Sequence, residues 1–125
     1  MHSGSCLCGD ITFTVAVSLA RPDACHCRQC RKQTGHYFAS TDVPKAAVTI
    51  TGQDKLVWFA SSEKIRRGFC ATCGSTLFWE PLHRDWMAVA MGAFDEPTET
   101  SLRMHIFVAD KGDYYAIDDG LPQRP

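Results

Sequence analysis

Apolar and polar residues alternate over several short stretches of the chain. The clearest stretch spans residues 11–17, where Ile11, Phe13, Val15 and Val17 alternate with smaller or polar residues. A period of two places one set of side chains on each face of a half-buried β-strand. Similar β-rich runs occupy residues 48–51, 55–60, 76–80, 86–91 and 105–109. The pattern therefore predicts a domain built mainly of β-strands.

Helical periodicity is scarce by comparison. Only residues 28–34 favour a short helix, and no amphipathic helical pattern extends beyond about three turns. The length of 125 residues fits one domain, and no repeat, low-complexity tract or linker divides it. We therefore expect a single mostly-β domain over residues 1–125 with little helix.

Charge and hydropathy exclude some classes of function. The net charge of -1 provides no overall field for a polyanion, so a nucleic-acid partner is not favoured. The longest nearly apolar run, residues 86–94, is too short to cross a bilayer. The first residues lack the charged start and apolar core of a signal peptide, so a cytoplasmic location is expected.

Seven cysteines form three tight clusters. The clusters are Cys6-x-Cys8, Cys25-x-Cys27-x-x-Cys30 and Cys70-x-x-Cys73, and no cysteine lies elsewhere. A disulfide framework is disfavoured because the count is odd and no secretory signal accompanies it. Two Cys-x-x-Cys turns within one chain instead indicate zinc, since each turn presents two sulfurs to one metal ion.

The clusters can be divided between metals in two ways. Cys6, Cys8, Cys70 and Cys73 can close one site, which leaves Cys25, Cys27 and Cys30 for a second site. Alternatively, the two Cys-x-x-Cys turns can form one zinc ribbon, which leaves three cysteines unused. The first division is favoured because it uses every thiol as a ligand, and it predicts two zinc ions per chain.

A site with three cysteines has chemical consequences. Three thiolates make the metal a weaker Lewis acid than three neutral histidines do, so generation of hydroxide is disfavoured. Such a site suits a fourth thiolate, which zinc holds deprotonated and nucleophilic. The open alternative is a closed structural site in which His26 or His36 supplies the fourth ligand.

Basic and aromatic residues near the clusters are less specific signals. The basic residues can receive carboxylates of an anionic thiol, or they can offset thiolate charge and form a solvated face. The aromatic residues are more often core than substrate wall. The residues concerned are Arg28, Arg31, Lys32, Lys64, Arg66 and Arg67, together with Phe38, Phe78 and Trp79.

The cysteine motifs resemble those of the glutathione-dependent formaldehyde-activating family, which includes centromere-protein-V-like domains. The resemblance rests on segments 4–9, 25–32 and 69–75, with C-terminal support from His105-Ile106-Phe107-Val108 and Asp118-Asp119-Gly120-Leu121-Pro122. It implies a β-tent fold with zinc-binding knuckles. By motif position it also implies a structural zinc on Cys6, Cys8, Cys70 and Cys73, and an open zinc on Cys25, Cys27 and Cys30.

The resemblance further implies a carbon–sulfur lyase of the S-(hydroxymethyl)glutathione synthase type. A small-molecule thiol such as glutathione would bind the open zinc, with Cys25, Cys27 and Cys30 as catalytic ligands, and attack formaldehyde or a related aldehyde. Two alternatives stay open. One is a non-catalytic zinc module that binds a protein or nucleic acid through Arg28, Arg31 and Lys32; the other is a thiol or metal buffer.

Overall fold

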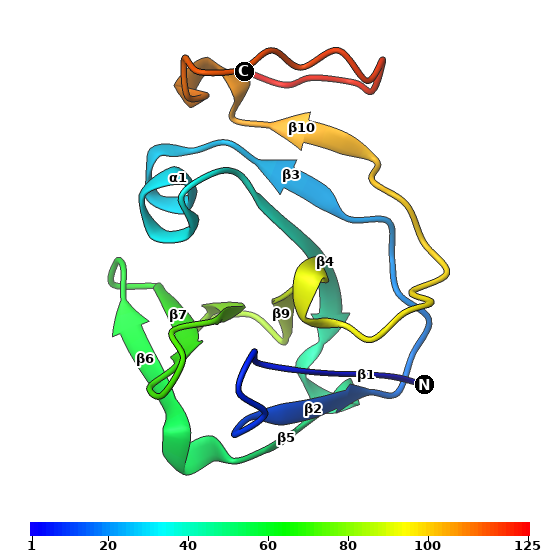
Figure 1. Cartoon of the computed structure of the whole chain (residues 1–125), viewed down its shortest axis with the longest axis vertical. Helices are drawn as coiled ribbons and strands as arrows, with labels where there is room; N and C mark the ends of the chain where they lie inside the picture. The colour runs from blue at the N-terminus through cyan, green and yellow to red at the C-terminus, as the bar shows by residue number, and fades with distance from the viewer.

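Two β-sheets make up most of the chain in the computed structural model, which describes residues 1–125 (Figure 1). The single α-helix, α1, spans Arg28–Thr34, and four short 3-10 turns complete the helical structure. The strands are β1 (His2–Ser5), β2 (Thr12–Val15), β3 (Asp23–Cys25), β4 (Phe38–Pro44), β5 (Val48–Thr51), β6 (Leu56–Ala60), β7 (Ile65–Cys70), β8 (Thr76–Pro81), β9 (Trp86–Ala90) and β10 (Met104–Ile106). The expected mostly-β fold with little helix is confirmed.

The two sheets differ in size and connection. The small sheet has the order β1-β2-β5, and the large sheet has the order β10-β3-β4-β9-β8-β7-β6. All neighbours pair antiparallel except β10 and β3, which run parallel. The chain reaches β10 only after leaving β9 through residues 91–103, so the C-terminal part joins the edge formed much earlier by β3.

The main core lies between the two sheets. Phe13 of β2 contacts Phe78 of β8 edge-to-face, with ring centroids 5.6 Å apart. Val43 and Val89 extend the same cluster from β4 and β9, and both are almost fully buried. Aromatic and branched side chains bury large apolar areas, so this layer supplies much of the stabilisation of the fold.

The opposite face of the large sheet is different in character. Because side chains alternate across a strand, residues two apart share a face. In register across the sheet, Cys25 lies opposite Phe38, Asp42 opposite Ala88, and Arg67 opposite Trp79. These pairs lie on the face that does not pack against the small sheet, and that face is available for a functional site.

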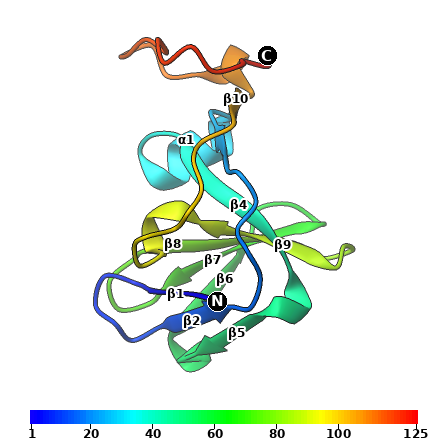
Figure 2. The same ribbon diagram turned by 90° about the vertical axis from the view of Figure 1, so that its right-hand side faces the viewer.

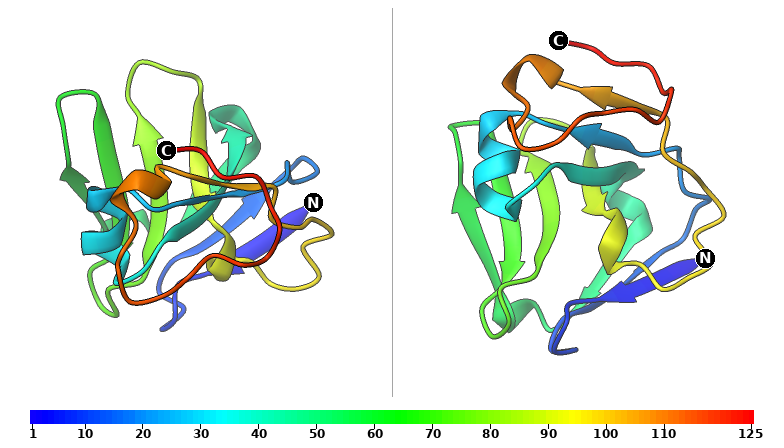
Figure 3. Two further views of the ribbon diagram at one scale, coloured as in Figure 1. Left: turned by 90° about the horizontal axis from the view of Figure 1, so that it is seen from above. Right: turned by 45° about the horizontal axis from the view of Figure 1, so that its top comes forward.

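Residues 107–125 continue from β10 as an irregular segment over the top of the molecule (Figures 1 and 2). The two views in Figure 3 show this segment next to α1 and β3. Backbone hydrogen bonds hold it in place: His105 N donates to Pro122 O and Arg124 N donates to His105 O, at 2.9 Å each. No helix in this fold has the length and hydropathy needed to cross a membrane.

Most predicted elements lie where the pattern placed them. The predicted helix over residues 28–34 coincides with α1, and the predicted strand over 48–51 coincides with β5. The predicted strand over 105–109 is wrong in its second half, because Phe107 adopts a left-handed backbone with φ of 54° and a 3-10 turn follows. The strands β1, β3, β4 and β7 were not anticipated.

Candidate metal centres

The first cysteine group joins two distant parts of the chain. Cys6 and Cys8 lie in the loop after β1, Cys70 ends β7, and Cys73 lies in the turn before β8. Their four sulfur atoms all lie within 4.8 Å of one another. The residues brought together are separated by more than sixty positions, so the fold, and not local sequence, assembles this group.

The sulfur spacing in this group fits a tetrahedral metal. Cys6 Sγ lies 3.6 Å from Cys8 Sγ, and Cys8 Sγ lies 3.8 Å from Cys70 Sγ. Two thiolates bound to zinc at about 2.3 Å with a tetrahedral angle lie about 3.8 Å apart. The four cysteines therefore fit a closed zinc site, and the chemistry of four soft sulfur ligands suits that metal.

Local backbone geometry shapes both turns of the first group. Gly9 and Gly74 follow the second cysteine of their turns and have φ of 83° and 78°, values that favour glycine. Ile11 N donates to Cys6 Sγ at 3.3 Å, and Ser75 Oγ lies 3.2 Å from Cys73 Sγ. The hydrogen bonds from Ser75 lower the pKa of Cys73 to about 5, which favours a thiolate ligand.

The second group is local in sequence. Cys25 ends β3, Cys27 is the N-cap of α1, and Cys30 lies in the first turn of that helix. Cys30 N donates to Cys27 Sγ at 3.3 Å, so one ligand both caps the helix and joins the cluster. The three sulfur atoms lie within 4.8 Å of one another, and no fourth cysteine, histidine or carboxylate completes the group.

The grouping of the sulfurs follows the first of the two divisions considered above. Cys27 and Cys30 do not gather with Cys70 and Cys73, so a single zinc ribbon is not formed. Neither His26 nor His36 joins the three-cysteine group. His36 is exposed, and its Nδ1 lies 3.0 Å from the hydroxyl of Tyr114.

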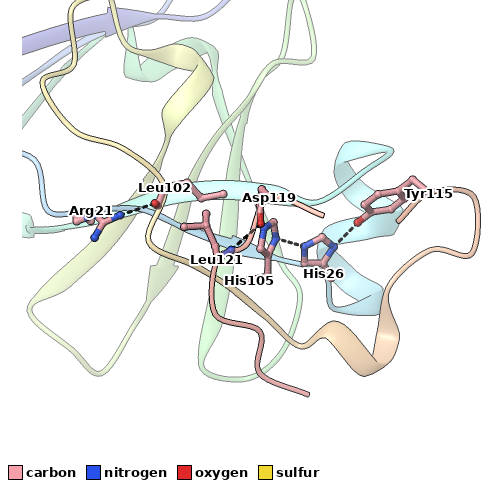
Figure 4. Close-up of polar contacts among 7 residues, drawn as sticks. All are labelled: Arg21, His26, Leu102, His105, Tyr115, Asp119 and Leu121. Atoms are coloured by element: carbon pink, nitrogen blue, oxygen red, sulfur yellow. Dashed lines mark hydrogen bonds and ion pairs between the residues drawn. The ribbon is translucent and has the colours of Figure 1, made fainter. Parts of the chain in front are cut away.

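His26 is buried and belongs instead to a chain of hydrogen-bonded polar side chains (Figure 4). Its Nε2 lies 2.8 Å from Nδ1 of His105, and its Nδ1 is hydrogen-bonded to the Tyr115 hydroxyl. His105 Nε2 in turn lies 2.7 Å from Asp119 Oδ2. Burial, with the nearby His105, lowers the pKa of His26 to about 4, so its imidazole is neutral at pH 7.

This chain of side chains was not anticipated from the sequence. It connects the segment between Cys25 and Cys27 to Tyr115 and Asp119 in the C-terminal part. Both ring nitrogens of His26 are therefore occupied by hydrogen bonds to Tyr115 and His105. The only signal in the sequence is that His26 lies between two cysteine ligands, so its side chain is expected to point away from theirs. That signal does not identify the hydrogen-bond partners of His26.

The three-cysteine group opens into a cavity of about 640 Å³. That volume lies within the roughly 300–1,000 Å³ of typical small-molecule sites. None of the cysteines of the first group contacts this cavity. The cavity is lined by the second group and by residues of β4, β7, β8 and β9, including Phe38, Ser40, Asp42, Ile65, Arg67, Trp79, Trp86 and Ala88. Ser62 of the β6–β7 turn and, from the C-terminal part, Ile106, Phe107 and Asp110 also line it.

The cavity has an aromatic wall and charged ends. Trp79 and Trp86 stack with ring centroids 5.8 Å apart. Arg103 pairs with Asp23 through two hydrogen bonds of 3.0 Å, whereas Asp42 has no ion-pair partner. Burial, followed by the charge of Asp23, raises the pKa of Asp42. The wall therefore offers apolar contact as well as groups of both signs.

The residues that were ambiguous in sequence divide clearly in the structure. Arg28 and Arg67 line the cavity, whereas Arg31, Lys32, Lys64 and Arg66 do not. Among the aromatic residues, Phe78 lies in the core, and Phe38 and Trp79 line the cavity. For the adjacent pairs Arg66 and Arg67 on β7 and Phe78 and Trp79 on β8, the distinction follows from the alternation of side chains between the two faces of a strand.

Comparison with known proteins gives a family match. The sequence model of the family described as glutathione-dependent formaldehyde-activating enzyme matches residues 1–110. The matched range contains both cysteine groups and all of the residues that line the cavity.

Two individual relatives extend the comparison. An uncharacterized lyase of Schizosaccharomyces pombe is 27% identical over 78 residues, which cover 62% of this chain and 56% of the relative. The match therefore spans little more than half of that protein's length. A crystal structure of a Rhodobacter sphaeroides protein superposes with a TM-score of 0.65 and 18% identity, covering 80% of this chain and 98% of that chain. This likeness supports the fold.

Proposed function

Because the chain belongs to the glutathione-dependent formaldehyde-activating enzyme family, we propose that it is a zinc-dependent carbon–sulfur lyase. In this proposal, Cys6, Cys8, Cys70 and Cys73 hold a structural zinc, and Cys25, Cys27 and Cys30 hold a second zinc at which a thiol binds. The expected substrates are a thiol such as glutathione and a small aldehyde such as formaldehyde. The S. pombe relative, named as a lyase, supports the same class of reaction.

One observation supports the proposal above all others. The three-cysteine group has no fourth protein ligand and forms part of the cavity wall, whereas the four-cysteine group is complete and lies away from the cavity. Structural zinc sites are normally closed by four protein ligands, and catalytic sites keep one position open. The difference between the two groups is the difference expected between a structural and a reactive metal site.

Cys25, Cys27 and Cys30 would hold the zinc ion, which would lower the pKa of a thiol bound at its remaining position and leave the thiol sulfur nucleophilic. The protein residues arrange the surroundings of that position. Cys27 and Cys30 are fixed by the first turn of α1, and Cys25 is fixed by pairing of β3 with both β4 and β10. Trp79 and Phe38 contribute apolar surface to the wall of the cavity.

The reaction requires no redox partner. A carbon–sulfur bond forms between the thiol sulfur and the aldehyde carbon, and the electron pair of the carbonyl double bond moves to oxygen. The thiol loses one proton and the oxygen gains one, so the product is a hemithioacetal, which for formaldehyde is the S-hydroxymethyl derivative of the thiol. In the lyase direction the same carbon–sulfur bond breaks and the aldehyde is released.

Titration calorimetry with glutathione on the metal-loaded protein tests this function. The wild type is expected to contain two zinc ions per chain and to bind the thiol. Cys27→Ser should retain the structural zinc and weaken thiol binding at least about tenfold, because an interaction of about 1.4 kcal/mol or more is lost. S-hydroxymethylglutathione formation, followed by NMR with labelled formaldehyde, reports the reaction itself.

His36→Ala is the matched control, because His36 is a nearby exposed side chain outside the cysteine group. This variant should bind glutathione as the wild type does. Thiol binding that ignores Cys27→Ser would contradict the proposal. A protein that binds no low-molecular-weight thiol, but binds an acidic protein or nucleic acid in a salt-sensitive manner, would support the binding-module alternative.

A further inference from the structure

Arg67 is a buried arginine without a carboxylate partner. Its residue is 4% exposed, and it lies on β7 at the wall of the cavity. None of the ion pairs of the protein includes it, although the neighbouring Arg66 pairs with Glu80 and Arg103 pairs with Asp23. A buried guanidinium is always charged, and burial of an unpaired charge is costly. A negative group close to Arg67 must offset that cost.

The contacts of Arg67 identify this group. Its Nη1 donates to Cys30 Sγ at 3.5 Å and to Gln33 Oε1 at 3.0 Å, and its Nη2 donates to Gln29 Oε1 at 3.2 Å. Its Nε is buried and has no partner. The two glutamine oxygens are neutral and orient the guanidinium from one face of α1. The cysteine sulfur is therefore the only contact that can carry the compensating negative charge.

Charge counting shows what this contact achieves. Three thiolates with one divalent zinc sum to -1, and Arg67 brings the sum to zero. A thiol that binds as an anion lowers the total by one further unit. Without Arg67 the same two states would carry -1 and -2 in a partly buried site, and each would be less stable.

We propose that Arg67 is the counter-ion of the metal-loaded three-cysteine group and that it tunes this group to accept an anionic thiolate as fourth ligand. The first part stands on the contacts of Arg67 alone, and the second part rests on the proposed function. Arg67 acts through Cys30, so it is a positioning residue. Gln29 and Gln33 hold the guanidinium in the orientation that reaches Cys30.

Two substitutions remove this charge in different ways. Arg67→Gln deletes it, and Gln29→Glu cancels it by placing a carboxylate beside Nη2 while the arginine stays in place. Both should lower the zinc affinity and the glutathione affinity of the second group by about tenfold to hundredfold. This is the range expected for the loss of a charged hydrogen bond. Arg67→Lys, which keeps the positive charge, should recover part of both affinities.

The measurements use the full chain. Zinc affinity is measured by competition with a chromophoric chelator, and thiol binding is measured from the sulfur-to-cobalt absorption of the cobalt-substituted protein titrated with glutathione. Arg66→Gln is the matched control, because it removes the same charge from the opposite face of β7. Its zinc affinity at the second group and its glutathione affinity should stay within about twofold of wild type.

The outcomes separate the two proposals. One outcome is a lower zinc affinity at the second group in Arg67→Gln or Gln29→Glu, together with a wild-type protein that binds no thiol. This outcome would support the counter-ion role and overturn the proposed function. Wild-type zinc and glutathione affinities in Gln29→Glu would overturn the counter-ion role, even if Arg67→Gln fails to fold. Unaltered affinities in Arg67→Gln would overturn it as well.

Discussion

Gly4 allows the first strand to approach its neighbours without a side chain in the way. A Cβ added there would lie 2.3 Å from Ala93 O and 2.5 Å from Phe13 Cζ, both closer than any normal contact. Gly4→Ala therefore forces backbone or core atoms to move, and we expect a loss of about 1–3 kcal/mol of unfolding free energy. Urea denaturation followed by tryptophan fluorescence measures this loss.

Gly92→Ala is the matched control, because it is the same substitution at a position with free space around it. A Cβ added at Gly92 meets no atom within 4 Å. Gly92→Ala should therefore change the unfolding free energy by less than about 0.5 kcal/mol. Equal effects of the two substitutions would contradict the steric argument for Gly4.

Residue-level reasoning from sequence was least informative where two similar side chains are adjacent. Arg66 and Arg67 are adjacent, and no feature of the sequence distinguishes their roles. In the structure, Arg66 pairs with Glu80 and covers the ring of Trp58 at 4.0 Å, whereas Arg67 contacts Cys30. The difference comes from the alternation of β7, which sequence predicts only once the strand itself has been recognised.

At the scale of elements, the C-terminal segment depends on one carboxylate. Asp119 accepts hydrogen bonds from His105 and from Leu121 N, and these bonds lower the pKa of Asp119. Because the folded pKa is lowered, the stabilisation is present above the ordinary value of 3.8 and is lost as the pH falls through the folded value. Asp119→Ala should produce the same loss at neutral pH.

Hydrogen exchange measures the effect on this segment. The amides of His105 and Arg124, which bond across the segment, should exchange severalfold faster in Asp119→Ala. Asp118→Ala removes an exposed neighbouring carboxylate and should leave both rates unchanged. Unchanged exchange in Asp119→Ala would show that the backbone bonds alone hold the segment.

The strands that the sequence predicted share regular patterns of branched and aromatic residues. Val48–Thr51 and Leu56–Ala60 are rich in such residues and were recognised. β1 contains His2, Ser3, Gly4 and Ser5, which favour turns, and β7 contains two arginines and a glycine. These strands form because neighbouring strands pair with them, which is tertiary information that local patterns do not contain.

At the scale of the whole molecule, the two cysteine groups should contribute unequally to stability. The first group connects the loop after β1 to the β7–β8 turn, and Cys70 is fully buried within it. Cys70→Ser should lower Tm by roughly 10 °C or more, because the free energy of structural zinc binding is folding free energy. Cys27→Ser, in the local second group, should lower Tm by only a few degrees.

Differential scanning calorimetry with and without a chelator measures both effects. The chelator should lower Tm of the wild type toward that of Cys70→Ser and should have little further effect on that variant. Equal losses in the two cysteine variants would contradict the division between a structural and an open group.

The candidate site was only partly predictable. The count of seven thiols favoured the division of sulfurs that the structure shows, because tetrahedral zinc takes four ligands and this division uses every thiol. The cavity wall was not predictable, since Phe38, Trp79 and Arg67 come from three strands whose faces depend on register. The contacts among His26, His105 and Asp119 depend on where the last twenty residues lie, which no local pattern specifies.

The contrast between a local and a distant cysteine group has a consequence during synthesis. The three sulfurs of Cys25, Cys27 and Cys30 leave the ribosome together, so this group can meet a metal ion before most of the sheet exists. Cys6 and Cys8 must wait until Cys73 has emerged and the chain between them has closed into a loop. The group that the finished protein uses to hold its layers together is therefore the last to be completed on the nascent chain.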